Sequence, residues 1–202
     1  MKTHARTHLL ALAVACSMAA CSQSPAPPAP PAPPAPPPAP TAPTPPPPPP
    51  SAVQVQEAAA SLAPTQGQTA TGNMKLWSFD NGVHIVGTIT GVKAGDTHAF
   101  HVHETGDCSA PDGASAGPHF NPAGHAHGQP DQGEHHLGDM PNQVADASGT
   151  LKVDVTIAGA TLRDGGPNDL IGRAFIVHAQ PDDYTSQPSG NAGARIACGV
   201  IQ

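Results

Sequence analysis

Alternating apolar and polar residues mark several short strands in the second half of the chain. Residues 151–157 read LKVDVTI and residues 83–89 read VHIVGTI, which is the period of a half-buried β-strand. The sequence Asp80-Asn81-Gly82 separates 75–79 from 83–89, and Asn-Gly favours a tight hairpin turn. We expect further strands at 97–103, 174–178 and 195–201. The pattern predicts an all-β domain.

Two long segments between these strands, 104–142 and 180–194, are rich in Gly, Pro, Asp and His and show no strand pattern. Loops of this length in a compact domain are usually functional. The stretch HAFHVHETGDC precedes and enters the first loop, and its His101 and His103 lie two residues apart, so an extended chain projects both to the same face. Alone, such a pair fits exposed polar positions on a half-buried strand equally well.

The N-terminal residues 1–21 have the pattern of a secretory signal. Lys2 and Arg6 precede the apolar run LLALAVACSMAAC, which is too short to span a bilayer. Small residues ahead of Cys21 resemble a bacterial lipobox, so we expect lipid on Cys21, with Cys16 as the weaker alternative. The prediction is a periplasmic or cell-envelope protein held to the membrane by a lipid anchor; cleavage without lipidation would leave it free in the periplasm.

Residues 22–68 are predicted to be a largely disordered, proline-rich linker. Residues 25–50 hold 18 of the 27 prolines, a composition typical of an extended polyproline II spacer. A proline-rich ligand for a partner's aromatic groove is the alternative. Residues 51–68 contain few large apolar groups and are expected to be disordered or locally helical. Residues 69–202 remain as a single domain.

Charge and cysteine content narrow the class of protein. After Cys21 the chain has six Lys plus Arg against fifteen Asp plus Glu, a net charge of −9 with histidine neutral. This charge argues against nucleic acid as a partner. Only Cys108 and Cys198 lie in the domain, and such a pair in an exported protein predicts one disulfide.

The first long loop concentrates potential metal ligands. Its sequence from 116 to 142, AGPHFNPAGHAHGQPDQGEHHLGDMPN, supplies six potential ligands: His119, His125, His127, His135, His136 and Asp139. A further histidine, His178, ends the later strand AFIVH. Imidazole suits copper and zinc, and histidines joined by one carboxylate suit structural zinc. A nonspecific metal-buffering tract is the alternative for a His-rich loop alone.

Six blocks occurring in one order through 72–202 resemble the copper/zinc superoxide dismutase family, in particular its exported bacterial branch. These blocks are FHVHETGDCS, AGPHFNP, HGQP, EHHLGDMPN, IGRAFIVHAQPDD and GNAGARIACGVI. The resemblance implies a flattened antiparallel Greek-key β-barrel or sandwich, immunoglobulin-like, with two long functional loops. It also implies disproportionation of superoxide to oxygen and hydrogen peroxide, with one copper and one zinc ion per subunit. Whether the chain is a monomer or a homodimer stays open.

The same resemblance assigns roles to individual residues. The implied copper ligands are His101, His103, His119 and His178, and the implied zinc ligands are His119, His127, His136 and Asp139. His119 would be shared by both metals and would also handle a proton. Arg195 would attract superoxide, and Asp182 would link one copper-bound to one zinc-bound histidine. His125 and His135 fall outside this set, His84 is expected at the surface, and His98 is expected to be structural.

Two other classes of protein compete with this interpretation. A periplasmic copper or zinc buffer or chaperone would bind metal without turnover, but a carrier needs exchangeable ligands. A cupin-like metal oxygenase also uses His-x-His on a strand, but there a glutamate ligand follows a few residues later. Here Glu104 is immediately adjacent to His103, and alternation points it away. Activity after metal reconstitution separates the three classes.

Overall fold

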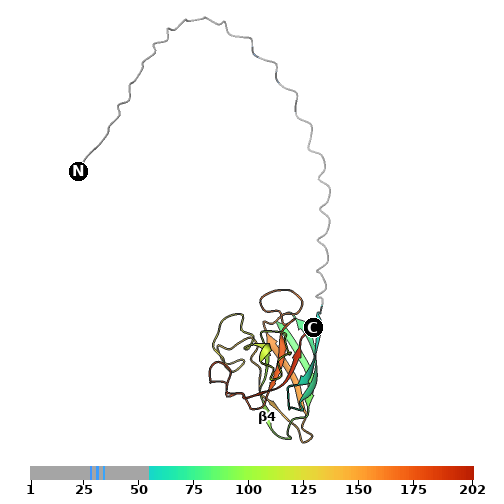
Figure 1. Cartoon of the computed structure of the whole chain (residues 1–202). Helices are drawn as coiled ribbons and strands as arrows, with labels where there is room; N and C mark the ends of the chain where they lie inside the picture. Colours follow the sequence, from blue (N-terminus) through green and yellow to red (C-terminus); the bar gives the residue numbers. More distant parts are fainter. Residues whose placement is uncertain (1–27, 29–30, 32–33, 35–54) are drawn as a thin grey trace, which may run out of the picture. The chain divides into compact units, whose positions relative to one another are not determined.

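A computed structural model describes residues 28, 31, 34 and 55–202 (Figure 1). The predicted signal segment, both candidate lipidation sites, Cys16 and Cys21, and most of the proline-rich stretch lie outside the described residues. None of the helical structure in the described part of the chain is long and apolar enough to cross a membrane.

The described domain is built from nine antiparallel strands and one short 3₁₀ turn. Seven strands form a curled sheet in the order β5-β8-β9-β1-β2-β3-β7, and β4 pairs with β6 in a small second sheet. This confirms the predicted all-β antiparallel class and the predicted hairpin, since β2 and β3 pair from Thr71↔Thr90 to Phe79↔Gly82. The bounds are β1 Glu57–Pro64, β2 Thr71–Phe79, β3 Gly82–Thr90, β4 Thr97–His98, β5 Phe100–His103, β6 Gln143–Val144, β7 Leu151–Ala158, β8 Ala174–His178, β9 Arg195–Val200 and the turn η1 Ala114–Ala116.

Strand β1 corrects the predicted linker. Residues 51–68 were expected to be disordered or locally helical, but Glu57–Pro64 pairs with β2 and then with β9, joining the two halves of the sheet. Its inward positions are Ala58, Ala60 and Leu62, all buried. The prediction was wrong here because small alanines suffice where neighbouring strands supply the large side chains. The folded domain therefore begins well before residue 69.

The strand predicted at 97–103 is interrupted at Ala99. His98 pairs with Gln143 of β6, whereas Phe100–His103 pairs with β8. Ala99 itself donates its N–H to Gln180 O at 2.9 Å and accepts from His178 N at 2.9 Å. The chain therefore changes sheets at Ala99, whose backbone N–H and carbonyl both keep a hydrogen-bond partner.

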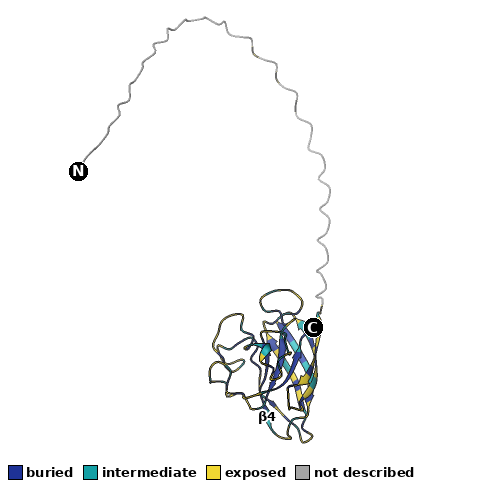
Figure 2. Ribbon diagram, viewed as in Figure 1, coloured by how far each residue is buried: buried dark blue, intermediate teal, exposed yellow. Residues whose placement is uncertain are grey.

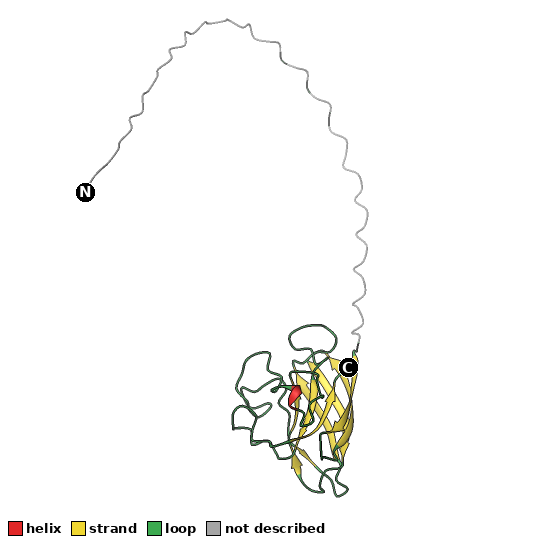
Figure 3. Cartoon of the chain, viewed as in Figure 1, coloured by secondary structure: helices red, strands yellow, loops and turns green. Residues whose placement is uncertain are grey.

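Two buried layers lie on opposite faces of β5 and β8. Phe100 and Phe175 stack on the core face with ring centroids 5.0 Å apart, together with the buried Val102 and Val177. All residues of β5 and β8 are nevertheless buried, including His101 and His103 on the other face (Figure 2). That second face is covered by the two long loops, which gather beside the sheet (Figure 3). The loops therefore enclose a polar site against these two strands.

Candidate metal centre

The structure brings seven predicted ligand residues into two adjoining groups. In each group, every residue offers one ligand atom, and these atoms lie within 4.8 Å of one another. Group one is His101, His103, His119 and His178, and group two is His119, His127, His136 and Asp139. All seven residues are buried, with exposed fractions between 0% and 7%. Each group thus has the size and donor types of a metal site.

His119 belongs to both groups because its two ring nitrogens face in different directions. Its Nδ1 lies 2.7 Å from Asp139 Oδ1 and 3.5 Å from His136 Nδ1, on the side of group two. Its Nε2 is buried and has no hydrogen-bond partner. On the side of group one, the rings of His101 and His103 lie with centroids 4.1 Å and 4.9 Å from that of His119. One imidazole can therefore join two metal ions.

The nitrogens that face away from group one are fixed by backbone carbonyls. His103 Nδ1 lies 2.8 Å from Gly117 O, and His178 Nδ1 lies 3.3 Å from Gly193 O. These contacts leave both Nε2 atoms in the group, 3.3 Å apart. Outer hydrogen bonds of this kind set the tautomer and orientation of metal-binding histidines.

Asp182 lies outside both groups and connects them by contacting one histidine of each. Its side chain is fully buried, with Oδ2 2.8 Å from His101 Nε2 and Oδ1 2.9 Å from His127 Nε2. The Nδ1 of His101 and of His127 is then the atom facing each group; His101 Nδ1 has no hydrogen-bond partner, and His127 Nδ1 lies 3.1 Å from Asp139 Oδ1. Asn142 holds Asp182 in place through Asn142 Oδ1, which accepts from Asp182 N at 2.8 Å.

The unpartnered nitrogens test whether metal fits this site. Two buried ring nitrogens, His101 Nδ1 and His119 Nε2, point into the groups without a hydrogen bond, and His127 Nδ1 faces only the carboxylate of Asp139, 3.1 Å away. Buried polar atoms normally have partners, and leaving one without costs about 1 to 3 kcal/mol. Metal coordination would satisfy all three at once. The donor set therefore fits one metal ion in each group.

The electrostatics of the metal-free site differ between the groups. In group one, burial lowers the pKa of His178 to about 3 and that of His119 to about 4, so both rings are neutral at pH 7 and able to bind metal. In group two, burial opposes charging of His127, but Asp139 and Asp182 outweigh it and raise its pKa to about 9. Burial opposes ionisation of Asp139 too, yet three histidines lower its pKa well below the usual range.

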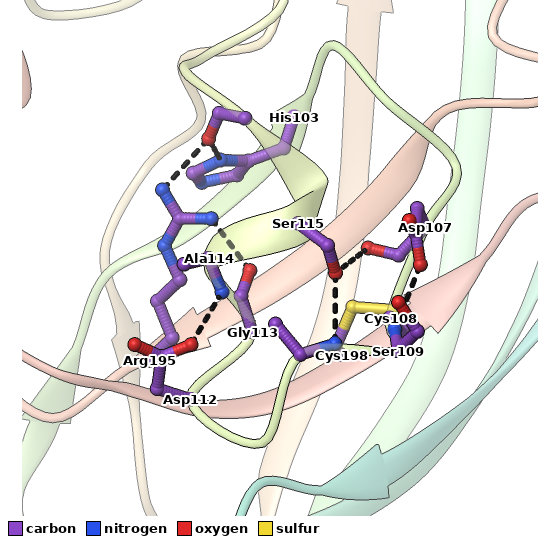
Figure 4. Close-up of a disulfide and its surroundings, with 12 residues drawn as sticks. His103, Asp107, Cys108, Ser109, Asp112, Gly113, Ala114, Ser115, Arg195 and Cys198 are labelled. Carbon is purple, nitrogen blue, oxygen red and sulfur yellow. Dashed lines mark hydrogen bonds between the residues drawn. A yellow bond between two sulfur atoms is a disulfide. The ribbon is translucent and has the colours of Figure 1, made fainter.

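An open cavity of about 680 Å³ reaches group one. Its lining includes His103, His119, His178 and Arg195. The Arg195 guanidinium donates to Gly113 O and Gly117 O, both at 2.7 Å. Figure 4 shows Arg195 and His103 side by side, bonded to the same carbonyl. A fixed positive charge therefore lies next to group one.

The predicted disulfide joins Cys108 to Cys198, with Cα atoms 5.7 Å apart and a sequence separation of 90. Cys198 lies in β9 three residues after Arg195, and Cys108 lies in the loop that also supplies the carbonyls bound by Arg195 (Figure 4). Ser115 closes that loop by donating to Asp107 O at 2.9 Å. The disulfide therefore ties the loop to the strand that carries Arg195.

The histidines predicted to lie outside the site are all outside both groups. His125 is exposed, and His135 lies 3.0 Å from Gly133 O at the surface. His84 pairs with Asp154 on the outer sheet face. His98 is buried, with Nδ1 2.8 Å from His178 O. Glu104 is exposed and lines the cavity without belonging to either group.

Sequence reasoning missed several residues that hold the ligands. Gln187 clamps His127 by accepting from its backbone N–H and donating to its carbonyl, both at 2.9 Å. Asn142 fixes Asp182, and Gly117 and Gly193 orient ligands through their carbonyls. Backbone carbonyls carry no residue-specific signal. Gln187 and Asn142 are recognisable only once the two loops are known to meet.

This fold and this site define a class of protein: an antiparallel β-barrel protein with two adjoining metal sites that share a histidine. Comparison with known proteins agrees. A family model described as copper/zinc superoxide dismutase (SODC) matches residues 70–201. "Superoxide dismutase [Cu-Zn] 2" of Aquifex aeolicus (strain VF5) is 42% identical over 149 residues, covering 72% of this chain and 86% of that protein. "Superoxide dismutase [Cu-Zn] 1" of the same organism is 42% identical over 134 residues, covering 65% and 79%.

Solved structures of similar proteins agree with this family. The crystal structure of a SOD-like protein from Bacillus subtilis is 36% identical, with a TM-score of 0.64, and covers 70% of this chain and 96% of its own. The structure of the clock protein EA4 is 39% identical, with a TM-score of 0.64, and covers 72% and 92%. The chain belongs to the copper/zinc superoxide dismutase family.

Proposed function

We propose that this chain converts superoxide to oxygen and hydrogen peroxide, two superoxide anions and two protons giving one molecule of each product. The observation that carries this proposal is His119, a single buried imidazole whose two nitrogens face two separate ligand groups. A metal buffer has no need of this shared ligand, and family membership supports the same reaction.

The two groups suit different metals. Group two contains the carboxylate of Asp139 among three histidines and is buried, which matches a closed tetrahedral zinc site. Group one contains four histidines, three of which line the cavity, whereas group two reaches it only through the shared His119 and His136; the more open group one matches copper with room for a small ligand. We therefore assign group one to copper and group two to zinc, the latter in a structural role.

Copper, when bound, supplies the one-electron chemistry that oxidises one superoxide and reduces the next. The protein's own residues bring the anion and a proton to that place. Arg195 offers a positive charge at the cavity, and its guanidinium is already held by two carbonyls, so little reorganisation is needed. His119 Nε2 faces group one without a hydrogen-bond partner, so it is the atom that would hand a proton to an anion there; burial lowers the pKa of the ring to about 4, which favours release of that proton at pH 7.

Metal reconstitution tests the assignment. The full chain, stripped with a chelator, should regain superoxide dismutase activity only with copper present, and zinc alone should raise its thermal stability. His178→Ala should abolish copper-dependent activity with a small change in melting temperature. Asp139→Ala should abolish zinc binding and lower the melting temperature more. Full metal binding without turnover would instead identify a metal carrier.

We also propose that the protein is exported and attached to a membrane by lipid on Cys21, with the proline-rich segment as a spacer. The support is the sequence alone: Lys2 and Arg6, the short apolar run, and the small residues before the cysteine. The disulfide adds support, because disulfides persist in compartments outside the cytosol. Cell fractionation tests the location, and sedimentation of the purified protein separates a monomer from a homodimer.

A further inference from the structure

Gly190 lies against the side chain of Asp182, the residue that connects the two ligand groups. Gly190 is buried and has φ +65°. A Cβ atom on this residue would overlap Asp182 Oδ1 and would lie 2.7 Å from His127 Nε2. The separations of this Cβ from Asp182 Oδ1 and from His127 Nε2 are both shorter than van der Waals contact. Any side chain at position 190 therefore competes for space with the bridge between the groups.

Asp182 has no second position in which it could make the same contacts. Its Oδ2 is 2.8 Å from His101 Nε2, and its Oδ1 is 2.9 Å from His127 Nε2. Oδ1 also accepts the N–H of Tyr184 at 2.7 Å. A Cβ on residue 190 would therefore displace Asp182 Oδ1, the oxygen that contacts His127 of group two. Rotation of the Asp182 carboxylate would also move Oδ2 away from His101.

The backbone around Gly190 resists a retreat of the loop. Gly190 N donates to Ser186 O at 2.7 Å, and Gly190 O accepts from Asp183 N at 2.9 Å. Asp183 Oδ1 in turn accepts the N–H of Ser186 at 2.8 Å. This small hydrogen-bonded loop holds Gly190 against Asp182. A side chain would therefore displace the Asp182 carboxylate before it displaced the loop.

We propose that Gly190 is a positioning residue for both metal groups, because only a residue without Cβ lets Asp182 bridge His101 and His127. This inference rests on the proposed function of the two groups as metal sites. Outer hydrogen-bond partners of metal ligands typically contribute 10- to 100-fold to metal affinity. We expect Gly190→Ala to weaken zinc binding by about this factor, and copper binding in the same direction.

The chain offers a matched control. Gly95 has φ +77°, close to that of Gly190, and a Cβ there would meet no atom within 4 Å. Gly95→Ala therefore carries the same cost of a left-handed backbone without any collision. If alanine at 190 acts only through backbone strain, both variants will behave alike.

Three measurements on the full chain test the inference. Zinc alone and copper(II) alone are titrated against a competing chelator in wild type, Gly190→Ala and Gly95→Ala. Proton NMR of the metal-free proteins follows the imidazole N–H protons of His101 and His127, which a carboxylate shifts downfield and protects from exchange. Both metals are also titrated into Asp182→Ala and into Asp182→Ala/Gly190→Ala, because removing the carboxylate removes the main collision.

Support requires that Gly190→Ala lose metal affinity and both protected N–H signals while Gly95→Ala keeps them, and that alanine at 190 change affinity less than threefold in the Asp182→Ala background. An insoluble Gly190→Ala rescued by Asp182→Ala would support the inference as well. Wild-type affinity and N–H signals in Gly190→Ala would overturn the inference. It would also be overturned if Asp182→Ala folds and Asp182→Ala/Gly190→Ala does not. A wild type that binds neither metal would refute the proposed function, while the N–H signals would still decide the role of Gly190.

Discussion

The metal-free protein should be most stable near neutral pH, because histidines of the site have pKa values shifted in opposite directions. Burial lowers the pKa of His178 to about 3 and of His119 to about 4, whereas Asp139 and Asp182 raise that of His127 to about 9. In the unfolded chain all three titrate near about 6.5. The free energy of unfolding then changes with pH according to the difference in bound protons between the two states.

On the acid side, the group-one histidines with lowered pKa values dominate: His103, His119 and His178. As the pH falls below 6.5, the unfolded chain binds protons on all three residues while the folded chain does not, so folding stability is lost. From pH 7 to 5, His119 and His178 cost about 2 kcal/mol each and His127 offsets about 1 kcal/mol, which leaves a net loss of about 3 kcal/mol; the loss from His103 adds to this. The histidines of group one titrate together, so these contributions are not strictly additive.

On the alkaline side, His127 dominates. Its folded-state pKa is raised, so its contribution is complete below pH 6.5 and is lost as the pH rises towards 9. Allowing for solvent screening, this loss is about 1 to 2 kcal/mol between pH 7 and 9. The maximum falls where the protons bound by these histidines in the unfolded chain equal the single proton that His127 keeps in the folded one, which is near pH 7.

Urea unfolding of chelator-treated protein between pH 5 and 9, followed by circular dichroism, measures this profile. His178→Asn should reduce the acid-side loss by about 2 kcal/mol, whereas His125→Asn, at an exposed position outside both groups, should leave it unchanged. Bound copper and zinc should remove the alkaline-side loss and steepen the acid-side loss, because ligation keeps the imidazoles unprotonated in the folded state while the unfolded chain still binds protons. Stability that rises steadily to pH 9, or an acid-side loss equal in wild type and His178→Asn, would refute the reasoning.

Three further predictions concern charge, covalent structure and location. Arg195→Ile should lower the second-order rate with superoxide at unchanged copper content, Arg195→Lys should keep most of it, and added salt should lower the wild-type rate; full, salt-independent activity in Arg195→Glu would exclude this role. Reduction of Cys108–Cys198 should lower the free energy of unfolding by about 4 kcal/mol in urea titrations, given the 90-residue separation, and two free thiols in the unreduced domain would contradict this. Cys21→Ala should move the protein from the membrane to the soluble fraction at unchanged specific activity; persistent membrane association would favour Cys16 or another attachment.

Alternation along the chain predicted β3, β7 and the hairpin before β3, because each strand has one face on the core and one in solvent. It missed β1, where Ala58 and Ala60 are small enough to resemble linker composition. It also ran β4 and β5 together, since Ala99 is apolar and gives no sign that the chain changes sheets. Such errors occur where pairing partners, not local residues, decide the structure.

The candidate site was more predictable than the strand boundaries, but for another reason. His101-Val102-His103 has a geometric meaning in any strand, whereas convergence with His178 and the long loop followed from resemblance to a family. Neither route reveals Gln187 or Gly190, whose roles depend on the meeting of two loops. Glutamine and glycine are common in surface loops, so their presence in the sequence does not indicate a role at the site.

The placement of the site on β5 and β8 links the fold to the proposed chemistry. A strand buried on both faces normally carries apolar residues throughout, yet here His101 and His103 alternate with Phe100 and Val102. The core face makes these strands rigid, and the opposite face holds imidazoles that only the two loops cover. Those loops contain little regular structure, so their attachment depends on the ligand groups, Asp182 and the disulfide. Loss of zinc should therefore loosen the loops first and leave the sheet folded, which hydrogen exchange at loop and strand amides can distinguish.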